Sequence, residues 1–259
     1  MLLDAILTVL RETLEAGVLV SLLAAVSRGC GLPRRWFVLA LPLGIGLAVL
    51  YAANLALISN WFDGVGQELL NSLLQYLICI SLLLLLTLLA RRERTRPGAL
   101  RACMTVAVIC AVTREGAEIL LFFSTYLQAE EALVRALTSG FVGLAVGLSV
   151  GVLTFIGLLT LPPAWRRRVQ ALLLSLVCAG MALQATQLLI QADWISTGMP
   201  LWNSSGLLSE NAMLGQMAYA VFGYEATPTA PEIIAYATVL ALLACVHLRP
   251  RLSARQNAR

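Results

Sequence analysis

The chain has 259 residues, of which 59% are hydrophobic and only 12% are charged, and its mean hydropathy is +0.85. Soluble domains carry about 25% charged residues, so this composition excludes a soluble globular protein and indicates a polytopic membrane protein. All 18 basic residues are arginine, and the formal net charge of +4 does not indicate nucleic-acid binding in a chain of this kind.

Seven apolar stretches of roughly 20 residues follow one another along the chain. Each is long enough to cross a hydrocarbon core of ~30 Å as a helix. They lie at about 2–26, 36–58, 69–90, 101–124, 137–160, 169–191 and 232–248. We therefore predict an all-α fold with seven transmembrane helices in a single transmembrane domain over 1–259, with an external loop at about 192–231 and a tail at 249–259.

Arginine is concentrated in alternate loops. These arginines are Arg28, Arg34 and Arg35, then Arg91, Arg92, Arg94, Arg96 and Arg101, then Arg166, Arg167 and Arg168, and in the tail Arg249, Arg251, Arg255 and Arg259. The intervening loops carry mostly acidic residues. The positive-inside rule predicts an external N-terminus and a cytoplasmic C-terminus, and an odd number of spans gives the same result.

Charged residues interrupt the first and fourth spans in the same pattern, Arg11-Glu12-Thr13-Leu14-Glu15 and Arg114-Glu115-Gly116-Ala117-Glu118. Each charge facing lipid would cost roughly 2.5–3.5 kcal/mol, so these side chains must face a protein interior. The two spans run in opposite directions. The pattern therefore predicts a 3+3 inverted repeat, about 1–90 and about 101–191, that leaves the seventh helix outside the symmetry and places a site near the membrane midplane.

Within each motif the helical period brings the arginine and both glutamates to one face. Two facing motifs would collect four carboxylates and two guanidiniums, which suits a hard cation, whereas a soft metal would need thiolate, thioether or imidazole. The predicted ligands are Glu12, Glu15, Glu115 and Glu118, with Arg11 and Arg114 beside them. A structural alternative is a pair of intramembrane ion pairs. Two copies, each with a surplus glutamate, favour an ion pathway.

Further polar residues fall on single faces of the sixth and third spans. They are Gln184, Gln187 and Gln191, and Asn71 and Gln75. Gln184 and Gln187 are candidates to support the site, although hydrogen bonding between helices is the commoner role of such residues. In the external loop, apolar residues at helical spacing between Ser209 and Gly223 predict a short amphipathic helix that lies in the interface or caps the bundle.

The Arg-Glu-x-x-Glu pattern in the first and fourth of seven spans resembles that of the oxidase-dependent iron permease family, which comprises fungal high-affinity iron permeases and bacterial EfeU-like proteins. The segment with Trp202, the run 204–210, Gly223-Tyr224 and Pro228 is also similar to the bacterial members. The resemblance implies that the four motif glutamates bind iron during translocation. Thr13 departs from the glycine frequent in the family, and the fungal Asp-Ala-Ser-Glu motif is absent.

The resemblance implies an iron permease of the bacterial inner (plasma) membrane, with iron ions as substrate and an extracytoplasmic iron oxidase or iron-delivery protein as partner. We expect no cofactor, no nucleic acid and no enzymatic activity, since there is no second catalytic constellation beside the glutamates. Without lysine the chain also has no Walker-type phosphate-binding sequence. Two alternatives stay open, a permease for another multivalent cation such as lead, and a membrane subunit whose motifs are structural ion pairs.

Overall fold

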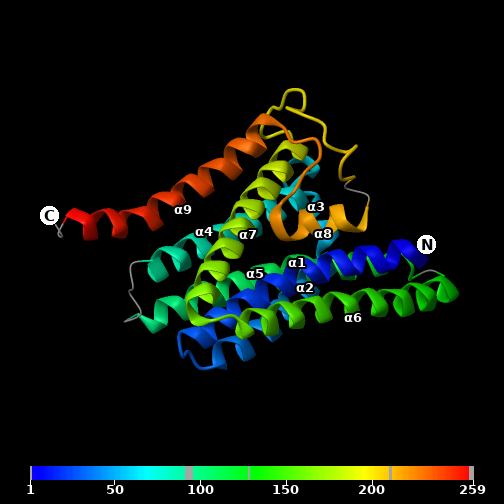
Figure 1. Ribbon diagram of the computed structural model, residues 1–259. Coiled ribbons are helices and arrows are strands. Elements are labelled where there is room, and N and C mark those ends of the chain that lie inside the picture. Colours follow the sequence, from blue (N-terminus) through cyan, green and yellow to red (C-terminus); the bar gives the residue numbers. More distant parts are fainter. Residues whose placement is uncertain (1, 91–95, 128, 210–211, 257–259) are drawn as a thin grey trace.

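The computed structural model describes residues 2–90, 96–127, 129–209 and 212–256. Within them the chain forms helices and no strand (Figure 1). The helices are α1 (Leu2–Gly29), α2 (Arg35–Ala53), α3 (Leu55–Ser59), the 3-10 turn η1 (Trp61–Gly64), α4 (Gly66–Ala90), α5 (Pro97–Ser124), α6 (Glu130–Thr160), α7 (Pro163–Gln191), α8 (Met213–Phe222) and α9 (Ala230–Gln256). The predicted loop arginines Arg91, Arg92 and Arg94, the acidic Glu210 and the tail end at 257–259 lie outside the described residues.

Four of these helices, α2, α4, α6 and α7, are long and apolar enough to cross a membrane, and α9 contains a shorter apolar stretch at Ala230–Val246. Large apolar side chains on α2 and α6 point outward, with Leu39 71%, Phe141 70% and Leu153 67% exposed. Such surfaces are stable against lipid and not against water. The chain is therefore a multi-pass membrane protein.

Helices α1 and α5 have 28 residues each, within the range of 19–31 residues of those four helices, but they carry the charged motifs and lie at the centre of the molecule. Helix α1 packs along α6 and also contacts α5, α7 and α8, whereas α5 packs along α2 and contacts α4. The third close pair is α4 with α7. Because other helices surround α1 and α5, the charged side chains of their motifs are kept away from lipid.

Stripes of small residues allow the two most extensively packed helix pairs, α1 with α6 and α2 with α5, to approach closely. On α6 the stripe is Ser139, Gly143, Gly147 and Gly151, and on α2 it is Ala40, Gly44 and Ala48. A Cβ atom on Gly143 would collide with the carbonyl oxygen of Ile6, and one on Gly44 would lie 3.3 Å from that of Ile109. This is the small-residue packing common between membrane helices.

The same two helix pairs also meet beside the motifs. A Cβ atom on Gly147 would lie 2.7 Å from the Cβ of Thr13, and one on Gly116 would lie 2.9 Å from the Cβ of Ala48. Thr13 and Gly116 occupy equivalent positions in the two motifs. At the crossing of α5 with α2, the glycine lies on α5 and faces an alanine of α2. At the crossing of α1 with α6, the glycine lies on α6 and faces a threonine of α1, so the smaller residue is on the motif helix in one pair and on its partner in the other.

The predicted second span, 36–58, is broken. Helix α2 ends at Ala53, and the chain continues through α3 and the turn η1, in which Phe62 and Asp63 have positive φ angles of 52° and 62°. Asn54 caps α2 by donating its side-chain amide to the carbonyl oxygen of Leu50. Competition of such side chains for backbone groups favours a helix end, and this signal was not used in the sequence prediction.

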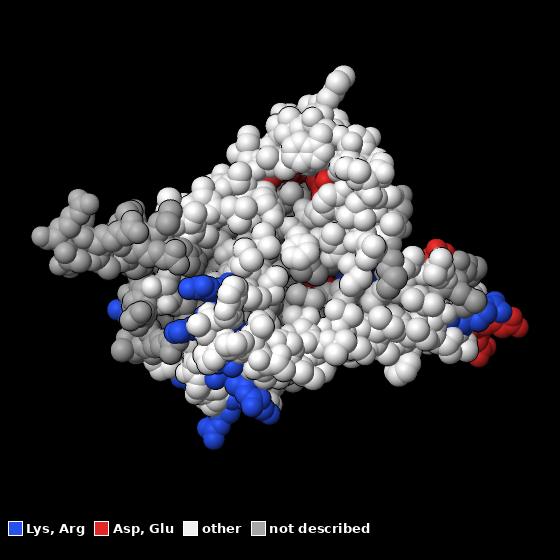
Figure 2. Space-filling model, in the orientation of Figure 1, with Lys and Arg blue, Asp and Glu red and all other residues white. Residues whose placement is uncertain are grey.

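The two ends of the molecule differ in charge. The start of α1 and the end of α9 lie at opposite ends of the bundle (Figure 1). Arginine side chains gather at the lower left of Figure 2, where Figure 1 shows the α1–α2 and α6–α7 junctions. The short helix predicted between Ser209 and Gly223 is confirmed as α8, which ends at Gly223 in the left-handed conformation (φ 66°) and packs against α1 and α7.

Candidate metal centre between α1 and α5

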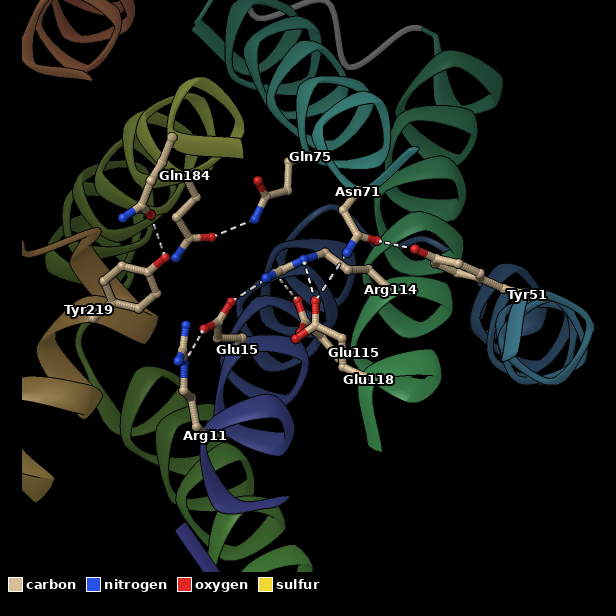
Figure 3. Close-up of polar contacts among 11 residues, drawn as sticks. Arg11, Glu15, Tyr51, Asn71, Gln75, Arg114, Glu115, Glu118, Gln184 and Tyr219 are labelled. Atoms are coloured by element: carbon tan, nitrogen blue, oxygen red, sulfur yellow. Dashed lines mark hydrogen bonds and ion pairs between the residues drawn. The ribbon is translucent and has the colours of Figure 1, made fainter. Parts of the chain in front are cut away.

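The two motifs lie next to each other inside the bundle (Figure 3). Glu12 and Glu15 of α1 are each 3% exposed, and Glu115 of α5 is 2% exposed. An isolated buried charge is costly, so groups of this kind must be paired or must hold an ion. The structure therefore brings together the residues that the sequence predicted to converge.

Arg114 lies at the centre of this group and contacts glutamates from both motifs (Figure 3). Its Nη1 donates to Glu15 Oε2 at 3.0 Å and to Glu115 Oε1 at 2.5 Å. Its Nε lies 3.3 Å from Glu118 Oε1, an ion pair without hydrogen-bond alignment. Its side chain is only 6% exposed, so the guanidinium neutralises carboxylates in an environment with little solvent screening.

Arg11 lies at the edge of the same group. Its Nε donates to Glu15 Oε1 at 3.4 Å, and its side chain is 37% exposed. The guanidinium carbon is 4.6 Å from the centre of the Tyr219 ring, a cation–π contact with α8. Among the glutamates that the structure describes, Arg11 therefore pairs only with Glu15, from its own motif.

Three carboxylates drawn from both motifs form a group that fits a metal ion. Glu12, Glu115 and Glu118 each offer one ligand atom, and these atoms all lie within 4.8 Å of one another. Oxygens bound to one hard cation at about 2.0–2.6 Å are separated by at most about 5 Å. The Oε2 atoms of Glu12 and Glu115 are buried and have no hydrogen-bond partner among the described residues, which is unusual for buried carboxylate oxygens and fits atoms able to bind a cation.

Glu15, the fourth predicted ligand, lies outside this group of three. Both of its oxygens receive hydrogen bonds, one from Arg11 and one from Arg114. With four carboxylates and two guanidiniums, the two motifs carry a net charge of minus two if every group is ionised. The surplus negative charge suits a multivalent cation.

A layer of amides and phenols from α2, α4, α7 and α8 surrounds the carboxylates. The Tyr51 hydroxyl donates to Asn71 Oδ1 at 3.0 Å, and Asn71 Nδ2 donates to Glu118 Oε1 at 3.4 Å. Gln75 Nε2 donates to Gln184 Oε1 at 2.7 Å, which joins α4 to α7. These bonds fix the orientation of groups beside the candidate ligands, a role typical of residues that surround a metal site.

The two predicted supporting glutamines occupy different places. Gln184 is 2% exposed, and its Nε2 has no partner among the described residues. Gln187 accepts a hydrogen bond from the Tyr219 hydroxyl at 3.1 Å and donates to Glu225 Oε1 at 3.2 Å. Gln184 thus belongs to the α4–α7 contact, and Gln187 connects α7 to α8 and to the segment between α8 and α9.

A cavity of about 330 Å³ connects the candidate ligands to one end of α4. It is lined by Thr8, Glu12, Gln67, Glu68, Asn71, Glu118, Leu121, Leu188 and Gln191. The Oε2 atom of Glu68 is buried there without a hydrogen-bond partner among the described residues. The cavity therefore has polar walls and contains two of the three grouped carboxylates.

The positions of Tyr51 and Tyr219 beside the site were not predicted from the sequence. Each tyrosine hydroxyl needs a hydrogen-bond partner when it is buried, and Tyr51 lies within an apolar span while Tyr219 lies on the apolar short helix. Searching these segments for a hydroxyl that requires a partner would have singled out both residues. Their partners, Asn71 and Gln187, are amides that the sequence did single out.

Comparison with known proteins identifies the family to which the chain belongs. The profile of the iron permease FTR1 family matches residues 2–256. The chain is 25% identical over 273 residues to the ferrous iron permease EfeU of Escherichia coli O6:H1 (strain CFT073), and 24% identical over 272 residues to that of Shigella sonnei (strain Ss046), with 96% of each chain covered in both cases. No solved structure matches the chain significantly. The chain belongs to the iron permease FTR1 family, whose members are transporters and not enzymes.

Proposed function

We propose that this protein imports iron ions across the bacterial inner membrane through a midplane site built from the two Arg-Glu-x-x-Glu motifs. The observation that carries the proposal is the group formed by Glu12, Glu115 and Glu118, whose ligand atoms lie within 4.8 Å of one another although they come from helices α1 and α5. A site shared between two helices of opposite direction is typical of transporters. Relatives named as ferrous iron permeases support iron as the cargo.

In this proposal the cation reaches the carboxylates through the cavity that contains Glu68. It then binds Glu12, Glu115 and Glu118 in place of water. Arg114, which pairs with Glu115 and Glu118 in the structure, moves away from them as the bound cation neutralises the two carboxylates in its place. Glu15, held by both arginines, becomes a fourth ligand when Arg114 is displaced, and Gln184 and Gln187 support the path.

We also propose seven spans arranged as a 3+3 inverted repeat, with the N-terminus outside and the C-terminus in the cytoplasm. The contacts between helices support this arrangement. In the proposed repeat α5 corresponds to α1 and α6 corresponds to α2, so the packing of α1 along α6 and the packing of α5 along α2 are equivalent contacts. Ile6 and Ile109, which lie equally far from the two motifs, both meet glycine of the partner helix. The alternation of arginine-rich and acidic loops supports the orientation.

Iron is the transported substrate, and the protein needs no cofactor of its own in this proposal. An inside-negative membrane potential favours inward movement of a cation by ~2.3 kcal/mol per charge per 100 mV. An extracytoplasmic iron oxidase or iron-delivery protein would present the ion at the outer surface, as the family resemblance implies.

The test is uptake of radioactive iron into proteoliposomes, supplied separately as ferrous and ferric iron. Wild type is compared with Glu12→Gln and Glu115→Gln at equal protein incorporation, and Glu131→Gln serves as a control because that residue is exposed on α6 and paired with Arg135. We expect uptake by wild type and the control and loss of uptake in both motif variants. Undiminished uptake in the motif variants would assign the motifs to structural ion pairs.

The three carboxylates also suit other multivalent cations, because oxygen ligands alone do not distinguish between them. Competition by unlabelled lead or another divalent ion in the same assay identifies the cargo. A competitor that blocks uptake far better than unlabelled iron would show that iron is not the preferred substrate.

A further inference from the structure

A second and larger cavity lies at the arginine-rich end of the bundle, away from the glutamates. Its volume is about 960 Å³, and it is enclosed by residues near the ends of α1, α4, α7 and α9. None of the motif residues lines it. It therefore needs an explanation other than the candidate cation site.

The charged lining of this cavity is entirely basic. Arg166, Arg167 and Arg168, in the first turns of α7, line it, and no acidic residue does so among the described residues. The positive end of the α7 helix dipole lies at the same place, since the helix begins at Pro163. A cavity with this charge repels cations and attracts anions, so it does not suit an exit route for iron.

A buried amide provides an independent indication of a ligand. Gln170 lies one turn further along α7, lines the same cavity and is 5% exposed. Its Nε2 has no hydrogen-bond partner among the described residues. Buried donors in folded proteins are nearly always satisfied, and an anionic oxygen in the cavity would satisfy this one.

The remaining walls are apolar and indicate an amphiphile. Leu86 and Leu89 of α4, Leu174 of α7, and Leu240 and Leu243 of α9 line the cavity. Nearby, Arg168 lies over the ring of Trp165, with its guanidinium carbon 5.8 Å from the ring centre. Exposed tryptophan is typical of the head-group level of a membrane, so the arginines lie where lipid phosphates are found.

We propose that this cavity binds an anionic phospholipid. The phosphate contacts the arginines of α7 and Gln170 Nε2, and the acyl chains lie against the leucines of α4 and α9. Basic pockets between membrane helices are known to hold anionic head groups. The lipid would join α9, which lies outside the proposed repeat, to the ends of α4 and α7.

Native mass spectrometry of the delipidated full chain in detergent tests this proposal, with phosphatidylglycerol and phosphatidylcholine as probes. We expect wild type to retain phosphatidylglycerol in preference to phosphatidylcholine, with affinity falling about fivefold for each arginine removed. The variants are Arg166→Gln, Arg166→Gln/Arg167→Gln and Gln170→Leu. Arg135→Gln is the matched control, because that arginine is exposed and lies in the first turns of α6.

Equal retention of both lipids by wild type, or unchanged phosphatidylglycerol binding in the double variant, would overturn the proposal. Displacement of the lipid by glycerol 3-phosphate at equal concentration would assign the site to a soluble phosphate compound and overturn the lipid assignment. Gln170→Leu removes no charge, so a loss of binding in this variant with an unchanged elution volume separates ligand recognition from misfolding.

Discussion

The two Arg-Glu-x-x-Glu motifs have the same residues at their charged positions but different surroundings. Arg114 of α5 is buried and contacts Glu15, Glu115 and Glu118. Arg11 of α1 is about one-third exposed and contacts Glu15 alone among the glutamates. Arg114 thus lies at the centre of the site and pairs with glutamates of both motifs, whereas Arg11 lies at the edge of the site and pairs with Glu15.

The difference arises from helices outside the motifs. Near α1, the short helix α8 supplies Tyr219, whose ring covers Arg11. Near α5, Tyr51 and Asn71 of α2 and α4 reach Glu118 through hydrogen bonds. Two copies of one motif can therefore have different surroundings when a helix such as α8 covers only one of them.

The largest expected effect is a difference in the free energy of unfolding between variants of the two arginines. Arg114→Gln leaves buried carboxylates without their cation, and we expect it to destabilise the protein by about 3–5 kcal/mol. Arg11→Gln removes a partly solvated pair and a cation–π contact, and should cost about 1 kcal/mol or less. Unfolding in detergent, followed by tryptophan fluorescence, measures both. Equal losses would show that the two motifs are equivalent.

The next effect separates Glu118 from Glu15, which occupy the same position in the two motifs. Glu118 is one of the three grouped carboxylates. Glu118→Gln should therefore weaken iron binding by more than about tenfold, since even residues that only support metal ligands contribute about 10–100-fold. Glu15 is held by arginine, so Glu15→Gln should weaken the first binding step less. Anaerobic ferrous iron titration of both variants measures the difference, and the reverse order would contradict the assignment of ligands.

A smaller effect tests the packing of α1 against α6 and of α5 against α2, the two helix pairs that are equivalent in the proposed repeat. Gly147→Ala places a methyl group against Thr13 and should destabilise the protein by about 1–3 kcal/mol, and adding Thr13→Gly should restore stability. Gly116→Ala should likewise be rescued by Ala48→Gly. Gly157→Ala is the matched control, since nothing lies within 4 Å of its added Cβ. Failure of both rescues would argue against the two equivalent crossings.

The smallest effect concerns the two tyrosines. Tyr51→Phe and Tyr219→Phe each remove one hydrogen bond, worth about 0.5–1.5 kcal/mol. Tyr51→Phe should also reduce iron uptake, because it frees Asn71, which contacts Glu118. Tyr219→Phe keeps its ring over Arg11 and should leave uptake nearly unchanged. Uptake assays on both variants, at matched protein incorporation, distinguish the two sides of the site.

Much of the candidate site could be predicted from the sequence because charges in apolar helices are forced inward. The helical period then predicted that Arg114, Glu115 and Glu118 share one face, and the second copy of the motif added Glu12 to the predicted ligands. The different role of Glu15 could not be predicted. It depends on how far each helix is rotated and on which arginine reaches across, and spacing within one helix contains no information on either.

The long helices could be predicted, because the length and hydropathy of a segment determine them. A helix end that depends on hydrogen bonding of a single side chain to the backbone was predicted less well. Helices α4, α6 and α7 cover the predicted stretches 69–90, 137–160 and 169–191. The predicted stretch 36–58 failed at Asn54, whose side chain ends α2 within an apolar region. Seven spans and the inverted repeat stay predictions, since α1 and α5 carry too many charges for apolarity alone to identify them as spans.

The central claim is that two motifs build one cation site. Equilibrium binding of ferrous iron to the purified protein under anaerobic conditions tests it most directly, with wild type, Glu12→Gln and Glu115→Gln compared. The account predicts one high-affinity ion per chain in wild type and loss of that ion in either variant. Two ions per chain, of which each variant loses only one, would contradict a shared site.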